Sequence, residues 1–143
     1  MMMMTAINRK RPTGVWVISI FYLVSAAFSA FSYYIVYSGK VVVSDAQAAY
    51  FAGLTGWDHL ISAMQGILSV SGAVALFAMK RPAPYLFSAN MVLGAGVTVW
   101  QIVTKGWMDA IGVSGAIGAL MGWTILIAVC IYAWRLLKKG WLT

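Results

Sequence analysis

The chain has 143 residues, of which 62% are hydrophobic and only 9% are charged. Soluble domains carry roughly 25% charged residues, and so few charges cannot cover the surface of a water-soluble fold of this size. Ten Lys and Arg against three acidic residues give a net charge of +7. Composition therefore excludes a soluble enzyme, a disordered tail and a disulfide scaffold, and it indicates an integral membrane protein.

Four apolar stretches are long enough to cross a membrane as helices, which takes about 20 residues. They run over about 14–37, 56–79, 84–104 and 113–134. None alternates as a transmembrane strand would. The first is longer than the core of a signal peptide and has no cleavage site, so we expect it to be retained. The sequence predicts an all-α integral membrane protein in which residues 1–143 form a single four-span domain.

Basic residues concentrate on one side of the predicted spans. That side collects Arg9, Lys10, Arg11, Lys80, Arg81, Arg135, Lys138 and Lys139. The other side has only Lys40 and Lys105, together with Asp45, Asp58 and Asp109. Cytoplasmic loops carry an excess of Lys and Arg, so we expect four transmembrane helices in an antiparallel bundle with both termini cytoplasmic. The expected location is the cell membrane, with multiple passes and a bacterial inner membrane favoured.

The segment 38–55 is the one sizeable loop on the outer side of the predicted spans. Ser44 and Gln47 have the spacing of a helix capping box, and a short amphipathic helix is predicted to follow them. Its aromatic residues Tyr50 and Phe51 are expected to face lipid or the bundle.

Few residues are suited to catalysis or to metal binding. A single Cys, Cys130, cannot form an internal disulfide or a redox pair. A single His, His59, cannot build a zinc site alone or ligate a haem from both sides. We therefore expect no enzyme, no cofactor and no metal site. No soluble basic face with interleaved aromatic residues is predicted, so we expect no nucleic-acid partner.

Small and polar side chains recur at helical spacing along one face of each predicted span. They either pack the helices together or line a site in the outer half of the bundle. The candidate polar cluster consists of Asp58, His59, Ser62, Gln65, Thr98 and Gln101. Because a short connection makes the second and third spans neighbours, Gln65 is predicted to lie near Gln101 or Thr98. Residues of the first span that complete this cluster are Ser29, Ser32 or Tyr33.

Four further interpretations concern particular residues. Asp58 alternatively caps a helix with Thr55, and His59 is alternatively a hydrogen-bonding residue at the membrane surface. The predicted helix-packing residues of the fourth span are Ser114, Gly115, Gly118 and Gly122. Leucine at Val129 of the same span is expected to have much less effect than leucine at Gly118 or Gly122 if Val129 faces lipid.

Two functions from different classes remain open. The first is a protein that acts without catalysis, as a subunit, assembly factor or homo-oligomeric helper, through helix–helix contacts. Its expected partners are the lipid bilayer and either itself or a larger membrane complex. The second is a carrier or channel for a small solute or ion, which works as an oligomer because four helices leave little room for a path. A lysis-type pore former is a third alternative.

Overall fold

The computed structural model describes residues 11–143, and within that range it has helices and no strands. In chain order the helices are α1 (Thr13–Tyr37), α2 (Asp45–Ala52), α3 (Gly56–Phe77), α4 (Ala83–Lys105) and α5 (Trp107–Lys138). Four of them, α1, α3, α4 and α5, are long and apolar enough to cross a membrane. The prediction of an all-helical chain with four helices of spanning length is confirmed. Arg9 and Lys10 lie outside the described residues.

The last long helix differs most from its predicted boundaries. It begins at Trp107 instead of Val113 and continues past Trp134 to Lys138. At Gly112 the backbone leaves helical geometry, with φ 63° and ψ −172°, a conformation that is essentially restricted to glycine. The predicted span therefore corresponds to the regular part of α5 after Gly112. Residues 107–111 form a short helical segment before the break.

Replacing Gly112 with Ala is expected to lower the free energy of unfolding by about 1–3 kcal/mol, because a side chain there strains the backbone. A Cβ at this position has no neighbour within 4 Å, so no steric clash contributes. The matched control is Gly96→Ala in the regular helix α4, where space is also open and where Ala stabilises by up to about 1 kcal/mol. Denaturation in mixed detergent micelles measures both; equal changes would contradict the special role of Gly112.

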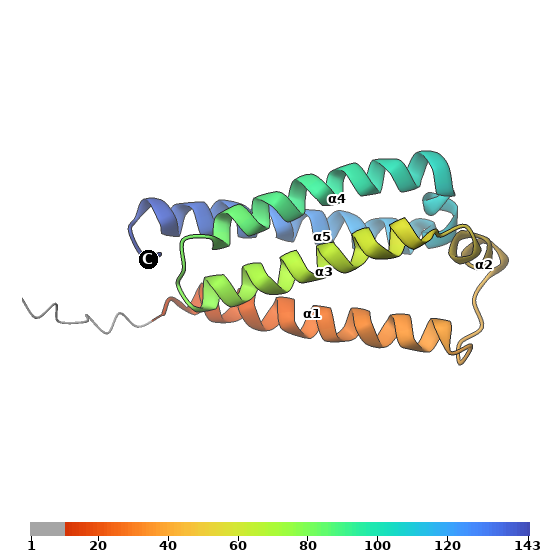
Figure 1. Cartoon of the computed structure of the whole chain (residues 1–143), viewed down its shortest axis with the longest axis horizontal. Coiled ribbons are helices and arrows are strands. Elements are labelled where there is room, and N and C mark those ends of the chain that lie inside the picture. The colour runs from red at the N-terminus through yellow and green to blue at the C-terminus, as the bar shows by residue number, and fades with distance from the viewer. Residues whose placement is uncertain (1–10) are drawn as a thin grey trace, which may run out of the picture.

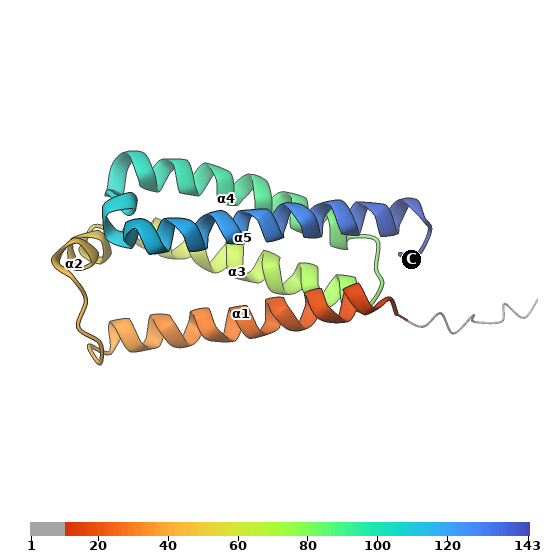
Figure 2. The ribbon, with the colours of Figure 1, turned by 180° about the vertical axis from the view of Figure 1, so that it is seen from behind.

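The two ends of the molecule contain different elements. The start of α1, the α3–α4 connection and the C-terminus lie at one end, whereas α2 and the α4–α5 connection lie at the other (Figures 1 and 2). α3 packs against both α1 and α4, and α4 also packs against α5. α2 packs against α5. We call the first end the core end and the second the α2 end.

The hydrophobic core lies at the core end. Its residues come from the start of α1, the end of α3, the start of α4, the second half of α5 and the segment that follows: Val15, Leu76, Ala83, Phe87, Val129, Cys130, Ala133, Leu136 and Leu142. Val129 is only 5% exposed in this core, so it does not face lipid, and the condition for its tolerating leucine is not met. It lies seven residues after Gly122, which is two helical turns, so the two residues share one face of α5.

The segment after α5 is fastened to the α3–α4 connection by the backbone. The amide of Thr143 donates to the carbonyl of Met79 at 2.8 Å, and the amide of Arg81 donates to the carbonyl of Thr143 at 3.3 Å. Between these contacts Leu142 enters the core and is 2% exposed. The last residues thus close the core end of the molecule.

Candidate functional site

Asp58 closes the first turn of α3. Its Oδ2 accepts hydrogen bonds from the backbone amide and the hydroxyl of Thr55, both at 2.7 Å. In return, Thr55 Oγ1 accepts from the amide of Asp58 at 3.4 Å, which completes a capping box. Lys105, the last residue of α4, approaches the same Oδ2 to 3.5 Å and donates to the carbonyl of Gly53 at 2.7 Å. This arrangement matches the capping alternative for Asp58, with Lys105 fastening the α2–α3 connection to α4.

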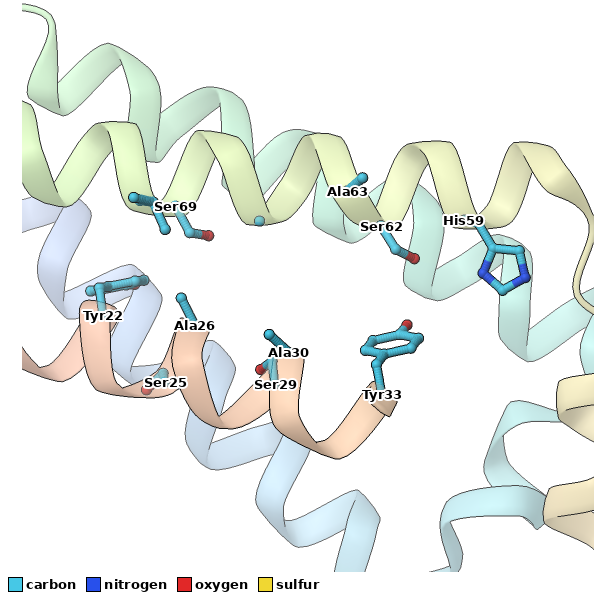
Figure 3. A pocket seen from close by; sticks show the side chains of 12 residues that line it. Tyr22, Ser25, Ala26, Ser29, Ala30, Tyr33, His59, Ser62, Ala63 and Ser69 are labelled. Atoms are coloured by element: carbon cyan, nitrogen blue, oxygen red, sulfur yellow. The ribbon is translucent and has the colours of Figure 1, made fainter. Parts of the chain in front are cut away.

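A cavity of about 660 Å³ lies between α1 and α3 over part of their length. Near the core end the two helices are in direct contact, since the Ser19 hydroxyl donates to the carbonyl of Ala73 at 3.2 Å. Trp16 packs edge-on against Phe77 there, with ring centroids 4.8 Å apart. Toward the α2 end the helices diverge, and the cavity fills the space between them (Figure 3).

Hydroxyl-bearing and small side chains line this cavity. The polar ones are Tyr22, Ser25, Ser29 and Tyr33 from α1, with His59, Ser62 and Ser69 from α3. Figure 3 shows Tyr33, Ser62 and His59 pointing into the gap from opposite sides. His59 also lies beside Tyr37, whose hydroxyl is 3.3 Å from its Nε2. Among residues 11–143, no Asp, Lys or Arg lines this cavity, so it suits neutral groups that form hydrogen bonds.

The other members of the predicted polar cluster lie elsewhere. Gln65 and Thr98 line a second cavity of about 230 Å³ between α3, α4 and α5. Gln101 is buried and accepts a hydrogen bond from Tyr50 of α2 at 3.2 Å. Burial raises the pKa of Tyr50, as do the nearby Tyr33, Asp58 and Tyr37, so the Tyr50 hydroxyl keeps its proton and remains a donor. The six predicted residues thus occupy several separate environments.

The predicted packing face of α5 is uncovered at the α2 end. Ser114, Gly118 and Gly122 are exposed, and Gly115 is half-buried. A Cβ built at Gly118 or at Gly122 meets nothing within 4 Å in residues 11–143. Closely packed glycines are found on other helices: a Cβ at Gly72 of α3 would lie 3.2 Å from the Phe87 ring. Within residues 11–143, no side chain packs closely against Gly118.

Two contacts of the site were not expected from the sequence. They are the Lys105–Asp58 pair and the Tyr50–Gln101 hydrogen bond. The sequence contained a signal for the Lys105–Asp58 pair, because these opposite charges occupy helix ends on the same predicted side of the membrane. Within residues 11–143, no three His, Cys or acidic side chains gather in a way that would hold a metal ion.

The described residues define an all-helical protein with four helices of membrane-spanning length and apolar composition. Comparison of the chain with known protein families, with curated proteins and with solved structures gave no match.

Proposed function

We propose that the chain crosses the cell membrane four times as an antiparallel bundle, with the core end in the cytoplasm. Both termini are then cytoplasmic, and α2 lies on the external surface. Support comes from the charges beside the core end, which are Arg11, Lys80, Arg81, Arg135, Lys138 and Lys139. The positive-inside rule places such residues in the cytoplasm. In a bacterium the membrane is the inner one.

We further propose that the protein acts without catalysis, as a subunit, assembly factor or homo-oligomeric helper, through helix–helix contacts. One observation carries this proposal: a face of α5 is covered at one end and uncovered at the other. At the core end this face buries Val129. Tyr132 packs there so closely against Gly14 of α1 that a Cβ at Gly14 would lie 2.6 Å from the Tyr132 hydroxyl. At the α2 end the same face presents Gly118 to empty space.

In a membrane, apolar side chains gain little by moving from lipid into a contact between helices, so helices associate through close packing. Small residues allow that close approach. An uncovered face of small residues that continues a packed face is therefore suited to a helix from another chain. The partner is a second copy or a protein of a larger membrane complex.

Gly118→Leu is expected to weaken association roughly tenfold, a change of about 1.4 kcal/mol, because the leucine side chain keeps the partner helix at a distance. Native mass spectrometry of the full chain in mild detergent, with cross-linking in membranes, measures the complex. The stability of the isolated chain is not expected to fall, since nothing in residues 11–143 lies within 4 Å of the new Cβ.

Gly96→Leu on α4 is the control for the Gly118 variant. Gly96 also has open space around its Cβ position but does not continue a packed face of α5. The Gly96→Leu variant is expected to leave the complex intact. A wild-type chain that is purely monomeric with nothing bound, or a Gly118→Leu chain that assembles like the wild type, would refute the proposal.

A second candidate is a small-solute or ion carrier or channel with a polar site in the outer half of the bundle, working as an oligomer. It is favoured by the cavity of about 660 Å³ between α1 and α3, which is rich in hydroxyl groups. In the same mass measurement, a stable complex with another protein favours the helper, whereas a defined homo-oligomer is expected for either candidate.

A further inference from the structure

The side-chain amide of Asn90 has only one of its two ends paired. Asn90 lies in α4 and is 7% exposed. Its Nδ2 donates to the Ser69 hydroxyl of α3 at 3.0 Å. Its Oδ1 is buried and has no hydrogen-bond partner among residues 11–143. Buried polar groups in folded proteins are nearly always paired, so an acceptor left open in the interior points to a group that the chain itself does not supply.

The unpaired amide borders the cavity of about 230 Å³ between α3, α4 and α5. Asn90, Gly94 and Thr98 form its α4 wall at four-residue spacing. Gln65 of α3 enters from the opposite side and lies close to Gly94, where a Cβ would be 3.0 Å from Gln65 Nε2. Two amides and a hydroxyl therefore converge on one small space, which we call the amide cavity.

The remaining lining of the amide cavity is apolar or aromatic. It is made by Trp107, Ala119, Gly122, Trp123 and Leu126. Among residues 11–143, no ionisable side chain contributes to it. A charged ligand would therefore gain no counter-charge there. A neutral ligand with a small apolar part would keep its hydrogen bonds and contact the indole of Trp123.

The Ser69 hydroxyl can either donate or accept, so the Asn90 amide can leave either its oxygen or its amino group unpaired. A ligand that both donates and accepts satisfies both arrangements, and hydroxyl and primary amide groups do so. At about 30 Å³ for each water molecule in the liquid, the cavity has room for a molecule of several heavy atoms.

We propose that the amide cavity binds a small uncharged solute carrying a hydroxyl or primary amide group, and that Asn90 recognises that group. Gln65 and Thr98 supply the complementary hydrogen bonds. This inference goes beyond the proposed helix–helix function, which does not use Asn90, and it identifies a solute class for the interior of the bundle.

Saturation-transfer NMR with acetamide as the probe tests the proposal on the full chain in nanodiscs. Wild type is expected to give a saturable signal on the acetamide methyl group. Asn90→Leu is expected to weaken binding about fivefold to tenfold, which is the loss of one hydrogen bond. Thr98→Val is nearly isosteric, removes the hydroxyl from the same cavity and is expected to weaken binding to a smaller extent.

The control is Thr124→Val, because the Thr124 hydroxyl donates only to its own helix, to the carbonyl of Leu120 at 2.9 Å. Its acetamide signal is expected to equal that of the wild type. Circular dichroism checks the fold of each variant, and native mass spectrometry is expected to show that Asn90→Leu assembles normally, which keeps this test separate from that of the helper function. An absent wild-type signal, as expected if only water fills the cavity, would overturn the proposal. So would a signal unchanged in both the Asn90 and the Thr98 variants.

Discussion

Leu142→Ala is expected to lower the free energy of unfolding by about 2–5 kcal/mol, the usual range for truncating a buried leucine. Irregular segments after a last helix ordinarily tolerate substitution. Leu142 is different because it is 2% exposed and belongs to the core with Val15 and Leu76. Its position is fixed by the paired backbone of Thr143, so neighbouring side chains cannot readily fill the space that it leaves.

Unfolding of the purified chain in mixed micelles by a denaturing detergent measures the Leu142 effect. Leu120→Ala is the matched control, since Leu120 lies on α5, is 69% exposed and is expected to change stability by no more than about 0.5 kcal/mol. Similar losses for the two variants would show that the segment after α5 does not dock on the core in solution.

Topology reporters are expected to give opposite results at the two ends of the molecule. Alkaline phosphatase, which is active only outside the cytoplasm, is expected to be active when fused near Ala46 or near Met108. A fusion after Thr143 is expected to be inactive as a phosphatase and fluorescent as a cytoplasmic fluorescent protein. The physical reason is the excess of basic residues beside the core end.

The site of the last fusion matters for the reporter experiment. Joining the reporter after Lys139 would remove Leu142 from the core, so a linker after Thr143 leaves the docked segment intact. Phosphatase activity after Thr143 together with a cytoplasmic signal at Ala46 would reverse the proposed orientation. It would leave the helices themselves unchanged.

Local features of the fold were predictable because their causes are local. The four long helices follow from apolar runs of about 20 residues, and α1, α3 and α4 begin and end near the predicted positions. Both capping boxes, Ser44 with Gln47 and Thr55 with Asp58, were readable from a three-residue spacing and are present. The extension of α5 and its break at Gly112 were missed, because a single glycine in an apolar run does not reveal its backbone angles.

The candidate site was less predictable than the helices. Gln65 and Thr98 line one cavity, as their depth on neighbouring helices indicated. Gln101 instead pairs with Tyr50 of α2, and His59 lies in the cavity between α1 and α3. Helical spacing identifies which residues share a face, but the rotation of each helix decides which neighbour that face meets.

The sequence by itself determined the class of protein, the number of long helices and the residues that share each helix face. Only the tertiary structure decided that one face of α5 is buried at Val129 and open at Gly118. It also decided that Asn90 lines a cavity and that its Oδ1 has no hydrogen-bond partner among residues 11–143. In water, polarity distinguishes the inner from the outer side of a helix. In lipid both sides are apolar, so the fit of side chains decides which faces meet, and that fit depends on residues far apart in the chain.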